Sequence, residues 1–102
     1  MIKYKSLKKN IPTHIKVGNN EYEVLYTDEF KGGKTDGEMR PEINQIVIRN
    51  GMSAKESVHT YFHEFIHAVS EEYDARLTEA QVLQLEKAFA DFKNFFHHLE
   101  GK

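Results

Sequence analysis

The sequence predicts an α+β fold in which a small N-terminal antiparallel sheet of three to four strands packs on a pair of helices. Short segments rich in β-branched and aromatic residues occupy the first half of the chain. Apolar residues at three- and four-residue spacing fill the second half, where two helix-capping signals also occur. With 102 residues, the chain has room for a single domain, 1–102, with one hydrophobic core.

The first half of the chain contains three expected strands. Segments 14–17 and 22–26 flank a glycine-asparagine turn at 18–20 and predict a β-hairpin. Segment 43–48 is rich in isoleucine and valine and predicts a buried strand. Between these strands, three glycines within segment 31–37 predict a flexible loop.

The first residues, 1–10, are expected to form a flexible basic leader. They include four lysines and no acidic residue, and short charged termini are usually solvated and mobile. This segment has no apolar core of signal-peptide length, and no stretch elsewhere approaches the ~20 apolar residues of a membrane span. A cytoplasmic protein without membrane contact is therefore expected.

Composition restricts the chemistry that the chain can perform. A formal net charge of -2 argues against a general nucleic-acid binder, so no direct contact with nucleic acid is expected. The chain has no cysteine, which excludes disulfides and thiolate metal sites. A metal ion would have to be bound through nitrogen and oxygen atoms.

Two capping boxes mark the starts of the two expected helices. Ser53 and Glu56 begin a helix that should run to about Tyr73, and Thr78 and Gln81 begin a second one. The short linker between them predicts an antiparallel pair. Apolar residues of the second helix keep three- and four-residue spacing and are expected to lie in the core: Val82, Leu85, Phe89, Phe92, Phe96 and Leu99.

The stretch HEFIH, residues 63–67, lies within the first expected helix. His63 and His67 are four residues apart, so both imidazoles can point at one metal ion. Glu64 lies about 100° from His63 around the helix axis, which suits a base acting on a water beside that ion rather than a ligand. Histidine and carboxylate ligands with one open position are typical of catalytic zinc, so Zn²⁺ is the expected cofactor.

A third ligand is required, and the second expected helix offers two glutamates. Glu79 and Glu86 are seven residues apart and therefore lie on one face of that helix. Antiparallel pairing of the helices would place Glu86 level with the histidines, whereas Glu79 would have to reach from the first turn. Glu71, one turn beyond His67, lies too far along the helix to be a natural ligand.

Other side chains near the motif have weaker signals. His59 extends the histidine stripe by one turn, where it could touch substrate or support a ligand. A solvated or core-edge histidine without a catalytic role is expected instead. No residue that would stabilise an oxyanion can be assigned from the sequence; Tyr61, Tyr73 and His97 are the candidates.

Together with the strand-rich first half, segments 61–69 (YFHEFIHAV) and 77–82 (LTEAQV) resemble the small phage and mobile-element zinc metallopeptidases of the ImmA/IrrE type. The resemblance covers about residues 14–99. It implies a minimal gluzincin-like core, zinc bound by the two motif histidines and a glutamate of the next helix, and Glu64 as the catalytic base. It also implies proteolysis of regulatory proteins such as repressors.

The resemblance favours Glu79 as the third ligand, in contrast to the helix-pairing argument for Glu86, and Glu79 is the leading candidate. In larger members of the family this glutamate begins a Glu-x-x-Ala-Asn-type segment. The corresponding positions here hold Val82 and Leu83, so this chain departs from the family pattern.

The sequence therefore predicts a zinc-dependent metallopeptidase that hydrolyses peptide bonds of a protein or peptide substrate, such as a phage or mobile-element regulator. The alternative is a non-catalytic protein-binding module with a structural or vestigial zinc site. A glutamate beside the first histidine has a role in hydrolysis and none in a closed structural site, which favours the peptidase.

Overall fold

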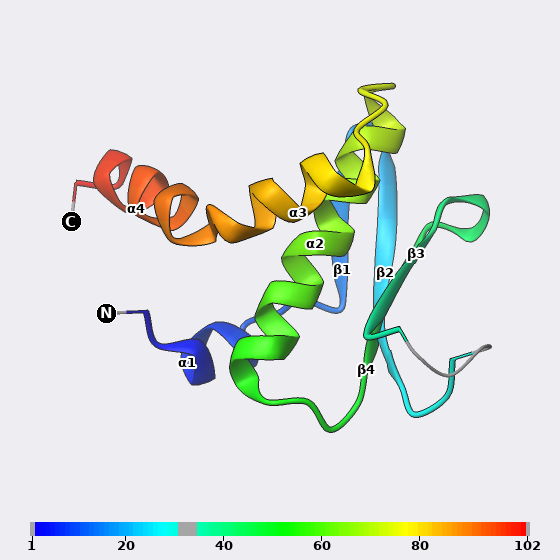
Figure 1. The fold of residues 1–102 in the computed structure, drawn as a ribbon, viewed down its shortest axis with the longest axis horizontal. Coiled ribbons are helices and arrows are strands. Elements are labelled where there is room, and N and C mark those ends of the chain that lie inside the picture. Colours follow the sequence, from blue (N-terminus) through cyan, green and yellow to red (C-terminus); the bar gives the residue numbers. More distant parts are fainter. Residues whose placement is uncertain (1, 31–34, 102) are drawn as a thin grey trace.

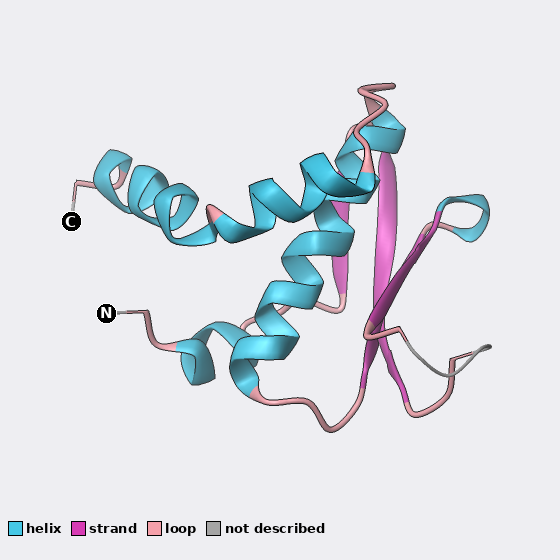
Figure 2. Ribbon diagram, viewed as in Figure 1, coloured by secondary structure: helices cyan, strands magenta, loops and turns pink. Residues whose placement is uncertain are grey.

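A computed structural model of the chain describes residues 2–30 and 35–101. Within these residues it shows an α+β fold with one four-stranded sheet and four α-helices (Figures 1 and 2). The strands are β1 (His14–Val17), β2 (Asn20–Thr27), β3 (Gly37–Arg40) and β4 (Gln45–Arg49). The helices are α1 (Tyr4–Lys9), α2 (Ala54–Glu72), α3 (Glu79–Lys87) and α4 (Phe89–Leu99). None of the described helices is long and apolar enough to span a membrane.

The sheet is mixed, so the expected antiparallel sheet is wrong. Its strand order is β1-β2-β4-β3. The β1–β2 hairpin is antiparallel as expected. The β3–β4 pair is also antiparallel, but β2 and β4 run parallel, with Val24 opposite Ile46. The reason is that β4 inserts between β2 and β3 rather than following β3 at the edge. Local turn signals specify hairpins, but they do not specify which strand occupies the centre of a sheet.

The edge strand β3 was not expected from the sequence. Segment 37–40 has one large apolar side chain, Met39, and pairs with β4 through its backbone. It overlaps the end of the expected flexible loop at Gly37, whereas residues 31–34 of that loop lie outside the described residues. The buried strand begins later than expected, because Ile43 lies in a 3-10 turn and is exposed.

The core forms where α2 crosses one face of the sheet. Tyr22, Ile46 and Ile48 are fully buried there. The buried core cluster consists of Val17, Tyr22, Val24, Ile46, Ile48 and Ala68. Figure 1 shows α2 in front of the sheet, with β3 on one side of it and α3 crossing it. Part of the surface of α2 therefore lies between the edge strand β3 and helix α3.

Both capping boxes are present. The Ser53 Oγ accepts from the Glu56 backbone N–H at 3.1 Å, and the Thr78 Oγ1 accepts from the Gln81 N–H at 3.1 Å. The glutamate and glutamine side chains accept from the backbone N–H groups of the capping residues in return. Helix α2 ends at Glu72, close to the expected end at Tyr73.

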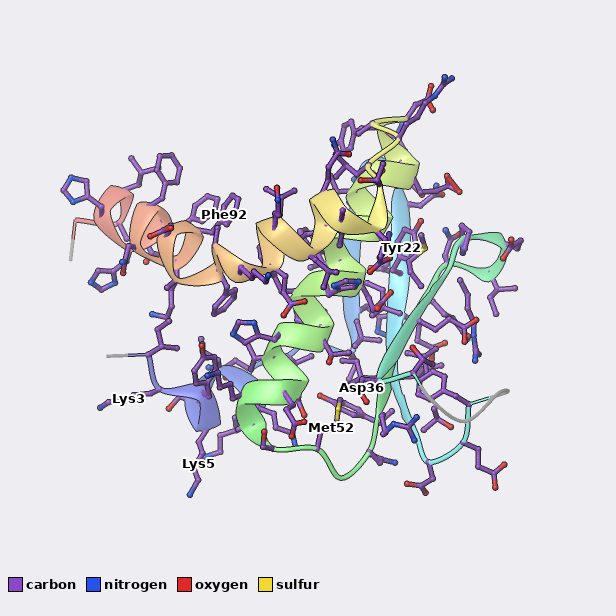
Figure 3. The ribbon with its side chains drawn as sticks, viewed as in Figure 1. Lys3, Lys5, Tyr22, Asp36, Met52 and Phe92 are labelled. Carbon is purple, nitrogen blue, oxygen red and sulfur yellow. The ribbon has the colours of Figure 1, made fainter. Side chains whose placement is uncertain are left out.

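The second expected helix is broken at Ala88 into α3 and α4. Val82 is buried as expected and Phe89 is half-buried, but the later phenylalanines are exposed. Phe92, labelled in Figure 3, is 38% exposed, and Phe95 and Phe96 are 59% and 61% exposed. Figure 1 shows the cause: α3 crosses α2 obliquely, so α4 runs beyond the sheet instead of returning along it. Helical periodicity identifies an apolar face but not the element that covers it.

The N-terminal segment expected to be a flexible leader contains α1. This helix lies against the first turns of α2, and the Tyr4 hydroxyl is 3.0 Å from Nε2 of His59. The lysines Lys3 and Lys5 point away from this contact in Figure 3. A basic segment can therefore be charged on one side and packed on the other.

Candidate metal centre

His63 and His67 lie on adjacent turns of α2, on the side that faces the start of α3. Their ring centroids are 5.0 Å apart, and the rings meet at 62°. Both side chains are largely covered, with 13% and 25% exposure. The four-residue spacing and the length of α2 place the two imidazoles side by side, as the sequence predicted.

Glu79 joins the two imidazoles from the first turn of α3. Its Oε1 is 2.7 Å from Nε2 of His63, and its Oε2 is 3.0 Å from Nε2 of His67. The linker directs α3 back to this point, because Ser70 Oγ accepts from the Leu77 N–H at 2.9 Å just before the Thr78 cap. The carboxylate thus reaches both histidines from the residue that begins the helix.

The donor set fits a divalent metal ion. The ligand atoms of His63, His67 and Glu79 all lie within 4.8 Å of one another. In residues 2–30 and 35–101, no other group of three histidine or acidic side chains meets this condition. Because imidazole and carboxylate lone pairs face each other, each contact requires a positive charge between them, either a proton or one shared ion. Two histidines and one carboxylate that leave a fourth position open are a typical zinc set.

Glu86 takes a different place from the one that antiparallel pairing predicted. Its Oε1 is 3.0 Å from Nδ1 of His63, the ring nitrogen that faces away from Glu79. Its Oε2 is 3.1 Å from Nδ1 of His59. The oblique crossing of α3 brings Glu79 rather than Glu86 to the Nε2 atoms. A carboxylate on the outer nitrogen of a ligand histidine orients the ring and leaves Nε2 free to bind metal.

Glu64 is 7% exposed and has no hydrogen-bond partner among the described residues. The pKa of Glu64 is raised to about 7. Burial is the main cause, His63 opposes it, and the carboxylates of Glu79, Glu38 and Glu86 add to the increase. A carboxyl group with a pKa near neutrality can both accept and return a proton at physiological pH. Glu64 therefore has the properties of a general base.

A cleft runs along both sides of Glu64, between β3 and α2. One part has a volume of about 300 Å³ and is shared by His59, His63 and Glu86; the other, of about 420 Å³, is shared by His67 and Glu79. Side chains or backbone that line both parts are Thr35, Gly37, His63 and Glu64. His63, His67, Glu79 and Glu64 thus all face open space between the edge strand and the two helices.

Gly37 allows β3 to approach this close to α2. A Cβ atom on Gly37 would lie 2.5 Å from Cγ2 of Thr60 and 3.2 Å from Oε2 of Glu64. Any larger residue would have to displace one of these side chains or the strand. The edge strand can therefore lie this close to Thr60 and Glu64 because residue 37 has no side chain.

No family model, curated protein or solved structure matches the chain.

The three oxyanion candidates lie away from the cleft. Tyr61 packs against the core cluster, where burial raises its pKa to about 12. Tyr73 is exposed at the end of α2, and His97 is exposed in the last turn of α4. None of them lines either part of the cleft beside Glu64.

The sequence interpretation did not predict the contacts of His59 and Tyr4. The four-residue spacing of His59 and His63 was a usable signal, because it places both rings on the face that α3 covers. Glu79 and Glu86 are seven residues apart and so lie on one face of the helix. This spacing was a signal that one carboxylate could reach Nε2 of His63 and the other Nδ1. Nothing in the sequence indicated that Tyr4, 55 residues from His59 along the chain, would contact it.

Proposed function

We propose that the protein is a zinc-dependent metallopeptidase that hydrolyses peptide bonds of a protein substrate. One observation carries the proposal: the ligand atoms of His63, His67 and Glu79 converge within 4.8 Å beside the buried Glu64. A metal-binding set alone would suit a structural site. A buried carboxylate next to that set, facing an open cleft, is the arrangement that metal-assisted hydrolysis requires.

The side chains of the site have different roles in the proposed peptide hydrolysis. His63, His67 and Glu79 would hold the ion. A bound zinc ion would polarise the substrate carbonyl and lower the pKa of a water molecule. Glu64 takes a proton from the attacking water and delivers the same proton to the departing amine. The carboxylate is therefore regenerated at the end of the reaction. The low exposure of Glu64 keeps its pKa close to the pH at which both transfers are needed.

The gluzincin-like assignment belongs to this proposal. Two histidines on one helix and a glutamate at the start of the next support it, and so does the likeness to the ImmA/IrrE type in segments 61–69 and 77–82. That likeness also supports a regulatory protein as the substrate. A single small domain that carries both the motif helix and the edge strand would be a minimal form of such a core.

A non-catalytic protein-binding module with a structural or vestigial zinc site is the second candidate. The observation that favours it is the exposed apolar face of α4, since contiguous apolar surface commonly marks a protein contact. The two candidates differ in the consequence of changing Glu64, because a binding module does not need a base.

Glu64→Gln is the decisive variant. The matched control is Glu71→Gln, which makes the same change at an exposed position of α2. Zinc content would be measured by elemental analysis, and cleavage by mass spectrometry of a mixed-sequence peptide library. We expect one zinc per chain in all three proteins, and a rate at least about 100-fold lower in Glu64→Gln alone.

Two results would count against the peptidase. Equal cleavage by the wild-type protein and Glu64→Gln would eliminate the proposed base. A zinc-loaded wild-type protein that cuts neither the library nor unfolded protein substrates would favour the binding module instead.

A further inference from the structure

A chain of hydrogen bonds connects α1 to the candidate metal centre. The Tyr4 hydroxyl is 3.0 Å from Nε2 of His59, and Nδ1 of His59 is 3.1 Å from Oε2 of Glu86. The other oxygen of Glu86 is 3.0 Å from Nδ1 of His63. Four side chains from three helices are therefore linked in series, and the last of them is a proposed metal ligand.

The protons of this series can be placed from the chemistry of the groups. An ionised Glu86 only accepts hydrogen bonds, so His59 and His63 each donate an Nδ1–H to it. A neutral His59 with a proton on Nδ1 has an acceptor at Nε2, which receives the Tyr4 O–H. A neutral His63 with a proton on Nδ1 has its lone pair on Nε2, the nitrogen that faces Glu79. One assignment satisfies the three hydrogen bonds of the series and leaves Nε2 of His63 free for the ion that it would share with Glu79.

Packing holds the middle of the series in place. The His59 ring lies 5.6 Å from the Tyr4 ring and 5.4 Å from the Phe89 ring, measured between centroids. Phe89 in turn lies 5.1 Å from Phe62. His59 and Glu86 are only 22% and 23% exposed, so water competes weakly for their hydrogen bonds. Without this support, Glu86 would be a surface glutamate free to leave His63.

We propose that Tyr4, His59 and Glu86 are positioning residues that hold the His63 ring in the orientation that binds metal, which makes α1 a part of the metal centre. The proposal rests on the metal site of the proposed function but not on catalysis. Outer hydrogen-bond partners of ligand histidines commonly contribute about 10–100-fold to metal affinity. Here the series would transmit that effect from a helix that supplies no ligand.

The test is a metal titration of full-length variants. Cobalt(II) affinity would be measured by competition with a chelator, and the geometry of the site by the visible absorption of bound cobalt. We expect a loss of about 10–100-fold in Glu86→Gln, a smaller loss in His59→Ala, and the smallest in Tyr4→Phe, which keeps the ring contacts. His59→Gln, whose amide can still donate to Glu86, should recover part of the loss.

Matched controls separate positioning from general stability. Tyr73→Phe and His14→Ala make the same changes at exposed positions, and thermal unfolding in the presence of chelator would be recorded for every variant. Wild-type cobalt affinity and spectrum in a folded His59→Ala protein would overturn the proposal. So would a loss of affinity in Tyr4→Phe no greater than in Tyr73→Phe.

The cobalt titrations and the cleavage assay test the two proposals separately. If no substrate is cut but the affinities follow the expected order, the peptidase fails and the positioning series stands. If cleavage depends on Glu64 but substitutions of His59 and Tyr4 leave cobalt affinity unchanged, the peptidase proposal stands and the positioning proposal is wrong. A wild-type protein that binds neither zinc nor cobalt overturns both.

Discussion

Glu64→Gln should stabilise the metal-free protein at neutral and alkaline pH. Burial raises the pKa of Glu64 from 4.5 to about 7, so the folded state holds a proton that the unfolded state has released. The contribution of this carboxyl group is fully present below pH 4.5 and is lost as the pH rises through about 7. Glutamine has a similar shape and no charge, so the variant avoids the loss.

The magnitude follows from the pKa. A change from 4.5 to about 7 corresponds to about 3 kcal/mol, at about 1.4 kcal/mol for each pKa unit. This is an upper value, because water can enter the cleft beside Glu64 and lessen the cost of its charge. We therefore expect Glu64→Gln and the wild-type protein to have similar free energies of unfolding at pH 4. The variant should be more stable by about 1–3 kcal/mol at pH 8.

Urea unfolding followed by circular dichroism, in the presence of chelator and at several pH values from 4 to 8, measures this difference. Glu71→Gln serves as the control, since Glu71 is exposed on the same helix and its replacement should have an effect that does not vary with pH. A stability difference between Glu64→Gln and wild type that is the same at pH 4 and pH 8 would refute the claim that the buried carboxylate is destabilised by its surroundings.

Two further substitutions probe the geometry of the site. Gly37→Ala should lower the free energy of unfolding by about 1–3 kcal/mol in urea titrations, because its Cβ would lie 2.5 Å from Cγ2 of Thr60. The additional change Thr60→Ser should restore part of the loss, and a lack of any rescue would contradict the clash. Glu79→Gln should abolish zinc retention in elemental analysis yet alter metal-free stability by less than about 1 kcal/mol, because the Glu79 side chain is 61% exposed. Full zinc content in this variant would exclude Glu79 as a ligand.

Much of the site was determined by local sequence. The capping residues Ser53 and Thr78 define where α2 and α3 begin, and helical geometry then places His63 and His67 on one face. The choice between Glu79 and Glu86 could not be made in the same way. It depends on the angle at which α3 crosses α2, and that angle results from the packing of whole helices rather than from any short segment.

The sequence by itself determined the α+β class, the two capping boxes and the pairing of two imidazoles beside one glutamate, because each of these depends on residues a few positions apart. Only the tertiary structure decided the parallel contact of β2 with β4, the contact of β3 with Glu64, the exposure of the phenylalanines on α4 and the link from Tyr4 to His63. Those features join residues that are far apart along the chain. Their formation depends on the competition among all packed surfaces at once, which no local pattern records.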